Sequence, residues 1–224
     1  MNEAEARDEI CRVGRSLFDR GYVHATAGNI SVCLEESEGG GYLITPTDSC
    51  LGFLDPARLA RLDANARQVS GDRASKTIAL HTEIYAAARR FDGHTACVIH
   101  THSAHCVALS FHDHAGELLP PITPYFVMKV GHVPIIPYYR PGASDAARHV
   151  ARVIQQYGEA GTPIRAVMLA RLGPNVWHES PAAAMATLEE LEETARLLVL
   201  APAKTASLTD IQLDELRQAF GARW

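Results

Sequence analysis

The sequence predicts an α/β domain. Segments with helical periodicity alternate with short apolar runs that are typical of buried strands. The 224 residues, 47% of them hydrophobic, are sufficient for one domain with a large buried core. No internal repeat is visible, which argues against solenoids and propellers. We therefore expect a single domain over residues 1–224, with residues 203–224 as an appended C-terminal helix or tail.

The N-terminal half is expected to contain helices and strands in alternation. A first helix is indicated by an apolar stripe formed by Ile10, Val13, Leu17 and Phe18, and Gly21 is its expected stop. Two strands should flank an acidic, glycine-rich hairpin turn at residues 35–41. The further elements predicted in this half are strands at 29–34, 42–45 and 97–101 and helices at 79–89 and 103–111.

The C-terminal half follows a proline-rich crossing at residues 119–124. Strand-like runs occupy 130–136 and 166–170, and Ser144 opens a helix that should end at Gly158. Ser180 is an expected N-cap followed by a proline, which introduces a long helix through residue 200. The last segment, 209–220, is predicted to be a short helix that serves as an oligomer contact or a loose tail.

Composition excludes several classes of function. The net charge of −5 and the dispersed basic residues argue against nucleic-acid binding. No apolar run approaches the roughly 20 residues of a membrane span, and the acidic first residues are unlike a signal peptide, so we expect a cytoplasmic protein with no membrane partner. The cysteines form no CxxC pair and are expected to be reduced packing thiols: Cys11, Cys33, Cys50, Cys97 and Cys106.

The most informative motif is a His-x-His at the end of a predicted buried strand. Residues two apart on a strand point to the same face, so His100 and His102 could present two imidazoles to one cation such as Zn²⁺. His105 follows three residues later, the separation at which side chains share a face of a helix. The alternative is that one or more of these histidines only packs or caps.

Three polar loops have the composition of an anion site. The first contains Thr26, Gly28 and Asn29, at the entrance to a strand, where backbone N–H groups can face a ligand. The second contains Thr47 and Asp48. The third, residues 71–77, adds hydroxyls and an ammonium group directly before a helix N-terminus, which favours anions. Each loop alone could be an ordinary turn; together with a metal they suggest a phosphorylated, oxygen-rich small substrate.

Read together, these motifs closely resemble the class II aldolase/adducin family over roughly residues 5–201. The resemblance rests on ATAGNIS (25–31), ITPT (44–47), the loop with Ser75, HTH (100–102) and the glycine-proline turn after Leu169. Three longer strings look most like the branch of the family that decarboxylates 3-oxo-tetronate 4-phosphate. They are SKT (75–77) ahead of His81, CLGFLDP (50–56) and PYFVMKVGHVP (124–134).

This resemblance implies a fold, a cofactor and an assembly. The fold would be a three-layer α/β/α arrangement around a central mixed, largely antiparallel sheet. A divalent metal, Zn²⁺ or alternatively Mn²⁺ or Co²⁺, would be held by His100 and His102, and the protein would be a homotetramer with active sites between subunits. Tyr125 falls where family aldolases contribute a tyrosine from the neighbouring subunit, although it could be an ordinary buried aromatic. The residues that would hold the phosphorylated substrate are Thr26, Gly28, Asn29, Thr47, Asp48 and Ser75.

One departure from the family pattern concerns acid–base chemistry. Family aldolases carry a glutamate four residues before the histidine that matches His81, whereas this chain has Thr77 there, preceded by Lys76. A β-keto acid needs no base to remove a C–H proton, because loss of CO₂ sends electrons into the ketone and a metal stabilises the resulting enediolate. Lys76 could orient the carboxylate or supply a proton; alternatively it only adds positive charge to the phosphate pocket.

The second departure concerns the metal. Relatives carry a third metal histidine immediately before the glycine of the late turn, and this chain has Leu172, which cannot ligate. Metal affinity should fall unless water, substrate oxygens or another histidine complete the coordination. The candidates considered are His105, His132 and His178.

Three functions follow from these observations. The first is a metal-dependent carboxy-lyase that converts a phosphorylated 3-oxo sugar acid, such as 3-oxo-tetronate 4-phosphate, to dihydroxyacetone phosphate and CO₂. The second is another sugar-phosphate aldolase or epimerase on the same scaffold. The third, which Leu172 favours, is a metal-poor, non-catalytic binding or assembly protein.

Overall fold

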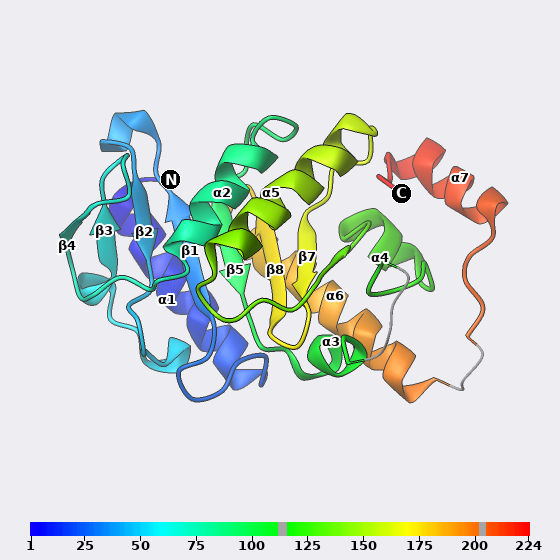
Figure 1. Cartoon of the computed structure of the whole chain (residues 1–224), viewed down its shortest axis with the longest axis horizontal. Helices are drawn as coiled ribbons and strands as arrows, with labels where there is room; N and C mark the ends of the chain where they lie inside the picture. Colours follow the sequence, from blue (N-terminus) through cyan, green and yellow to red (C-terminus); the bar gives the residue numbers. More distant parts are fainter. Residues whose placement is uncertain (112–115, 202–204) are drawn as a thin grey trace.

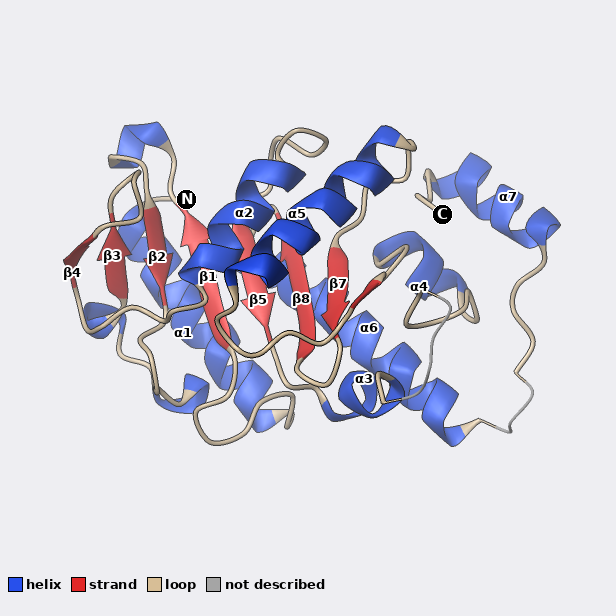
Figure 2. Cartoon of the chain, in the orientation of Figure 1, coloured by secondary structure: helices blue, strands red, loops and turns tan. Residues whose placement is uncertain are grey.

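The chain folds around one mixed β-sheet covered by helices on both faces. A computed structural model describes residues 1–111, 116–201 and 205–224. Within them the sheet has eight strands in the order β4-β3-β2-β1-β5-β8-β7-β6 (Figure 2). Every strand pair is antiparallel except β6 with β7, which is parallel. The expected three-layer α/β/α fold with a largely antiparallel sheet is confirmed.

Helices and strands alternate as predicted over most of the chain, except that β1 to β4 follow one another between α1 and α2. The strands are β1 (Asn29–Cys33), β2 (Tyr42–Ile44), β3 (Ala60–Leu62), β4 (Gln68–Ser70), β5 (Cys97–His100), β6 (Ile135–Ile136), β7 (Ala166–Leu169) and β8 (Gly173–His178). The helices are α1 (Glu3–Asp19), α2 (Ile78–Ala88), α3 (Ala104–Leu109), α4 (Pro124–Lys129), α5 (Ser144–Glu159), α6 (Pro181–Leu200) and α7 (Asp210–Phe220). Three short 3₁₀ turns, Glu36–Glu38, Leu51–Phe53 and Pro56–Arg58, complete the described structure.

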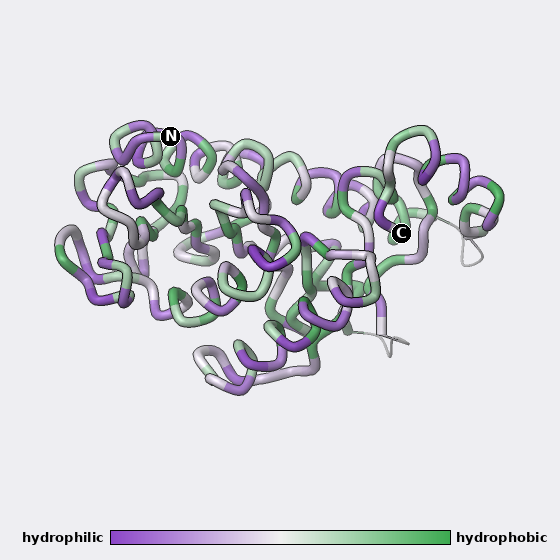
Figure 3. Tube along the Cα trace, turned by 90° about the horizontal axis from the view of Figure 1, so that it is seen from above, coloured by the Kyte–Doolittle hydropathy of each residue, from purple (hydrophilic) through white to green (hydrophobic). Residues whose placement is uncertain are grey.

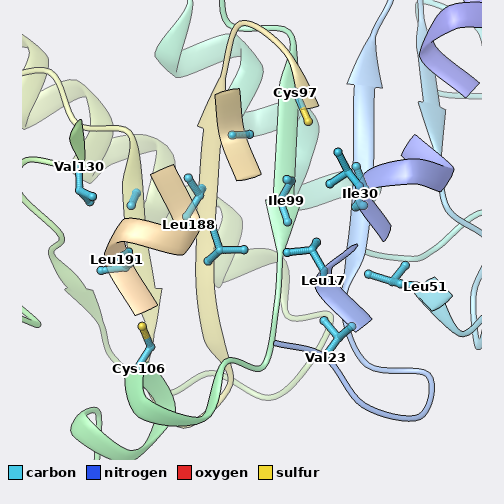
Figure 4. Close-up of a cluster of buried hydrophobic side chains, with 14 of the residues drawn as sticks. Leu17, Val23, Ile30, Leu51, Cys97, Ile99, Cys106, Val130, Leu188 and Leu191 are labelled. Atoms are coloured by element: carbon cyan, nitrogen blue, oxygen red, sulfur yellow. The ribbon is translucent and has the colours of Figure 1, made fainter. Parts of the chain in front are cut away.

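Helices α1 and α6 cover one face of the sheet, and the larger apolar core lies beneath them (Figure 1). Leu17 of α1 and Leu188 of α6 meet strand residues such as Ile30 and Ile99 in this layer (Figure 4). All four side chains are fully buried. Burial of this apolar surface is the main force that holds the two helices on the sheet.

Helices α2 and α5 lie side by side on the opposite face. Their core contains Ile84 of α2, Ile154 of α5, and Val98 and Trp177 from the central strands. Successive side chains of a strand point to opposite faces. Because Val98 lies beneath α2 and α5, His100 points to that face as well.

Most predicted elements are confirmed to within two residues at their ends, but one prediction is wrong and four elements, β3, β4, α4 and β8, were missed. The run at 130–136 is mainly not a strand: α4 ends just before it, at Lys129, and only Ile135–Ile136 pairs with β7. Helix α4 was not predicted; it forms because the Thr123 hydroxyl accepts a hydrogen bond from the Phe126 N–H and a proline occupies the first turn. The short strands β3 and β4 were also missed. Strand β8 was missed because its Gly-Pro start has the composition of a turn.

The described part of the appended C-terminal segment packs against the domain. The Trp224 ring stacks on His132 with a centroid distance of 4.2 Å, and α7 contacts α4. Figure 3 shows α7 at one end of the molecule, with hydrophobic and hydrophilic residues alternating along it. Residues 203 and 204, where the appended segment was expected to begin, lie outside the described residues. Among the residues that are described, none of the helices is long and apolar enough to span a bilayer.

Candidate metal and substrate site

Three polar side chains form a row across the centre of the sheet. Asn29 of β1 lies directly opposite His100 of β5, and His100 lies opposite Asn175 of β8. Directly opposed residues point to the same face, so all three face the α2 and α5 layer. Each is buried, and the Asn29 Oδ1 and both side-chain polar atoms of Asn175 have no hydrogen-bond partner. Buried amides without partners are costly, so this row is suited to receiving polar atoms of a ligand.

The strand pairing fixes the orientation of the His100 ring. Its Nδ1 lies 3.0 Å from the Pro174 carbonyl oxygen at the start of β8. A carbonyl only accepts, so we assign the ring proton to Nδ1, which leaves the Nε2 lone pair free. An N–H held by a backbone carbonyl is the usual arrangement of a metal-binding imidazole.

His102 lies in the loop after β5, not on the strand itself. Strand β5 ends at His100, so the prediction that strand alternation aligns the pair is wrong in detail. The loop nevertheless brings the two rings to a centroid distance of 5.1 Å. Gly173 makes this possible: a Cβ at that position would lie 1.9 Å from the Thr101 carbonyl oxygen and 3.3 Å from the His102 Cα.

Both imidazoles are favoured in the neutral form that binds metals. Burial lowers the pKa of His100 to about 4, and the nearby His102 is the second cause of this shift. Burial, followed by the nearby His24, also lowers the pKa of His102. At neutral pH a cation therefore meets free lone pairs and does not have to displace protons from this pair.

A cavity of about 420 Å³ opens beside the two histidines. It lies between the polar loops and the first turns of α2 and α5. Its lining includes every residue predicted for substrate or metal, namely Thr26, Gly28, Asn29, Thr47, Asp48, Ser75, His100 and His102, and also Lys76 and Thr77. The fold thus gathers side chains from four separate stretches of sequence around one cavity.

Two basic side chains and the Asp48 carboxylate line the cavity. Lys76 and Arg140 both line it, and in the described part of the chain neither has an ion-pair partner. Ser75 and Thr77 hold each other at an Oγ to Oγ1 distance of 2.6 Å immediately before α2. The free N–H groups of a helix N-terminus add to the attraction for anions.

Sequence reasoning missed the contribution of the loop before α5. Tyr139, Arg140 and Ser144 line the cavity, opposite the Thr26 and Ser75 loops. The Arg-Pro-Gly turn at 140–142, just ahead of a predicted helix start, was a usable signal, because a basic residue at a helix N-terminus is well placed for an anion.

The remaining predicted site residue, Tyr125, lies apart from the cavity. It stands on α4, is 61% exposed and does not line the cavity within this chain. The reading of Tyr125 as an ordinary buried aromatic is therefore wrong. A role contributed from a neighbouring subunit stays a prediction.

The three histidines considered as replacement ligands are engaged elsewhere. His105 Nδ1 lies 2.8 Å from Glu192 of α6, on the other side of the sheet. His132 stacks on Trp224 and contacts Glu117 at 3.3 Å. His178 accepts a hydrogen bond from the Glu179 N–H at the far end of β8 from His100. None of these three lines the cavity.

The fit to a divalent metal is good for two ligands and incomplete for the third. Leu172 lines the cavity and packs against the apolar core beneath α2 and α5. In the ranges that the structure describes, no three histidine, cysteine, aspartate or glutamate side chains already converge as a metal site. Two oriented, neutral imidazoles suit a borderline cation such as Zn²⁺, and at least one more donor must come from elsewhere.

His81 adds a buried imidazole behind the pair. Its Nδ1 lies 2.8 Å from the Ser31 Oγ, which lies 2.8 Å from the Tyr85 hydroxyl. Its Nε2 is buried without a partner. Burial, followed by the nearby His100, lowers the pKa of His81 to about 3, so this ring stays neutral behind the site.

A mixed sheet with paired histidines at the end of a central strand, beside a cationic cavity, defines a class II aldolase-type protein. The chain belongs to the family described as "Class II Aldolase and Adducin N-terminal domain", whose model matches residues 8–199. Members of this family are typically dependent on a divalent metal.

Particular relatives cover the whole chain. A 3-oxo-tetronate 4-phosphate decarboxylase of Cupriavidus necator is 48% identical, with 99% of each chain covered. The enzyme of the same name from Escherichia coli is 39% identical, with 96% of each chain covered.

Solved structures agree with these sequence relatives. The crystal structure of YgbL from Escherichia coli is 38% identical with a TM-score of 0.83, covering 96% of this chain and 99% of that one. The L-fuculose-1-phosphate aldolase of Thermus thermophilus is 26% identical with a TM-score of 0.73, covering 90% and 100%. The family resemblance predicted from the motifs is confirmed.

Proposed function

We propose that this protein is a metal-dependent carboxy-lyase that converts 3-oxo-tetronate 4-phosphate, or a close analogue, to dihydroxyacetone phosphate and CO₂. The observation that carries the proposal is the cavity in which two unpaired cationic side chains face two neutral imidazoles. A substrate with a phosphate at one end, a carboxylate at the other and a ketone between them matches these groups. The names of the relatives that cover the whole chain support the same reaction.

The reaction makes modest demands on the protein. The bond between the carboxylate carbon and C2 breaks, and its electron pair moves into the C2–C3 bond as the C3 ketone oxygen gains negative charge. CO₂ leaves, and a proton added at C2 gives dihydroxyacetone phosphate. No C–H bond has to be broken, so Thr77 can stand where family aldolases use a glutamate.

We assign the phosphate to the polar loops. The hydroxyls of Thr26, Thr47 and Ser75 and the Asn29 amide can donate to its oxygens, and the backbone at Gly28 and Asp48 shapes the same wall. Gly28 has a φ of +84°, and a Cβ there would lie 2.9 Å from the His100 carbonyl oxygen, so a side chain would disturb both the loop and the strand.

Lys76 is assigned to the other end of the substrate. Its ammonium group is exposed in the cavity and has no ion-pair partner in the described residues. There it can hold the departing carboxylate and deliver the proton that C2 receives. Arg140 faces the same space and can take either anionic end.

The metal is assigned to His100 and His102. A divalent cation bound there would stabilise the negative charge that develops on the ketone oxygen. Zn²⁺ is the cation that the imidazole pair suits best, with Mn²⁺ and Co²⁺ as alternatives. We further propose a cytoplasmic homotetramer in which Tyr125 reaches the cavity of a neighbouring subunit; the exposure of Tyr125 supports this assignment.

One observation favours a different function. Leu172 occupies the position of the family's third metal histidine, which would suit a metal-poor scaffold without catalysis. A sugar-phosphate aldolase or epimerase is disfavoured by Thr77, because those reactions need an acid–base group near the metal.

The three functions give different products from one substrate. The test incubates the metal-loaded full chain with 3-oxo-tetronate 4-phosphate and follows the mixture by phosphorus and carbon NMR. We expect dihydroxyacetone phosphate and CO₂ in equal amounts. An epimerised or aldol-cleaved product would support the second function, and unchanged substrate with a metal-loaded, folded protein would support the scaffold.

A further inference from the structure

We propose that His24 is the third protein ligand of the metal site and takes the ligand role that Leu172 cannot fill. The site would then consist of three imidazoles, from His24, His100 and His102, with an open position for a substrate oxygen. The inference rests on the metal site of the proposed function but not on the reaction itself. It concerns a residue outside the cavity lining and outside the motif strings that define the family resemblance.

The first observation is the position of the His24 ring. Its centroid lies 6.2 Å from that of His102, at an interplanar angle of 71°. The His102 and His100 centroids are 5.1 Å apart at 70°. His102 is thus the middle member of a chain of three imidazoles.

These separations are close to those of a shared metal. Zn–N bonds of about 2.0–2.1 Å at tetrahedral angles place the centroids of two bound imidazoles about 5 Å apart. The pair of His100 and His102 already has this spacing. His24 has to approach by about 1 Å, which rotation about its side-chain bonds can supply.

The second observation is that His24 is free to make this movement. Its side chain is exposed, and within the described ranges its imidazole has no hydrogen bond or ion pair. The other candidate histidines are engaged by Glu192, Trp224 and the Glu179 N–H, as described above. Among the histidines discussed as ligands, His24 alone combines proximity with an unengaged ring.

The third observation is that the backbone beneath His24 is fixed. Val23 is 3% exposed and anchors the loop in the core. The Ala27 N–H donates to the His24 carbonyl oxygen at 2.9 Å, and Ala25 between them adopts a left-handed φ of +47°. Such a conformation is unfavourable for alanine, and strained residues held in place by their surroundings are concentrated at functional sites. A held backbone and an exposed, unpaired side chain lower the cost of completing the site when the cation arrives.

The donor set indicates the class of ligand. Three neutral imidazoles with one open position are a typical catalytic Zn²⁺ site, and they discriminate against Mg²⁺ and Ca²⁺, which prefer oxygen ligands. We therefore expect a preference for Zn²⁺ or Co²⁺ over Mg²⁺.

The test measures Zn²⁺ affinity of the untagged full chain against a competing chelator, with Zn²⁺ itself as the probe. His24→Ala is compared with His94→Ala, which removes another exposed loop histidine beyond the other end of β5. We expect His24→Ala to weaken Zn²⁺ binding at least 10-fold and to alter the visible bands of bound Co²⁺, with no change for His94→Ala. Circular dichroism checks that both variants are folded.

A rescue variant makes the test specific. Leu172→His in the His24→Ala background returns an imidazole to the cavity wall and should restore Zn²⁺ affinity. Equal affinity of His24→Ala and the unmodified chain would overturn the inference, as would failure of the unmodified chain to bind Zn²⁺. If His24→Ala weakens binding but no CO₂ is formed by the unmodified chain, the inference stands and the proposed function fails. If CO₂ is formed while His24→Ala binds Zn²⁺ normally, the function stands and the inference fails.

Discussion

Replacing Gly173 by alanine should damage both the fold and the site. Gly173 opens β8 with a φ of +142°, a conformation that side chains rarely adopt. An added Cβ would lie 1.9 Å from the Thr101 carbonyl oxygen, where ordinary van der Waals contacts begin near 3.4 Å. The atom it meets belongs to the backbone, so no side-chain rotation relieves the clash. The loop carrying His102 has to move by more than 1 Å.

The magnitude follows from two contributions. Backbone strain at such a position costs about 1–3 kcal/mol. Forcing an extra carbon into a packed region costs about 1–3 kcal/mol more. Gly161 provides a matched control, because its φ is +83° but a Cβ there would meet nothing within 4 Å. The unfolding free energy of Gly161→Ala should therefore fall only by the cost of the left-handed backbone strain, about 1–2 kcal/mol.

The assay is urea unfolding of the metal-free protein followed by far-ultraviolet circular dichroism. We expect Gly173→Ala to lose about 2–6 kcal/mol of unfolding free energy and to lose more than Gly161→Ala. Its Zn²⁺ affinity should also fall, since His102 moves with the loop. Equal losses in the two variants, with Zn²⁺ affinity retained in Gly173→Ala, would refute the claim that this close approach positions His102.

Three further predictions test the chemistry. Lys76→Ala should lower kcat by about 10- to 100-fold with a smaller change in KM, because it removes a charge-assisted hydrogen bond worth about 1.5–3 kcal/mol. A normal kcat with a raised KM would assign Lys76 to anion binding alone. Thr47→Val should raise KM up to about 10-fold at nearly constant kcat, because it removes one neutral donor to the phosphate; a fall in kcat alone would contradict that role. His81 has a folded-state pKa of about 3 against 6.5 for the free side chain, so below pH 6.5 the unfolded chain gains a proton that the folded chain does not. His81 should therefore contribute about 2 kcal/mol to the fall in unfolding free energy between pH 7.5 and pH 5 in the metal-free protein, and His81→Gln should remove that part of the loss.

Periodicity predicted the larger elements of the fold because their packing agrees with their local pattern. Helix α1 shows its core residues at helical spacing, and α6 has an N-cap and a proline at its start. The strand prediction at 130–136 was wrong because the apolar residues there are buried without forming a strand: Val130 caps α4 and Val133 packs in the core. The pairing that creates β8 is a long-range property that no local pattern carries.

The predicted cavity residues were found because chemistry and motif agreed at those positions. Hydroxyl-rich loops and the two histidines meet in space as the sequence suggested. Arg140 was missed because its role depends on the tertiary fold, which places the loop before α5 and the Thr26 loop around one cavity. His24 was missed because its proximity to His102 arises from antiparallel pairing of β1 with β5, which brings residues far apart in sequence together.

The central claim is tested most directly by CO₂ release from carboxyl-labelled 3-oxo-tetronate 4-phosphate as Zn²⁺ is returned stepwise to the stripped protein. The account predicts that the rate rises with bound Zn²⁺ and levels off near one ion per chain, with dihydroxyacetone phosphate formed in equal amount. Full Zn²⁺ loading of the folded protein without CO₂ release, or an undiminished rate in the stripped protein, would contradict it.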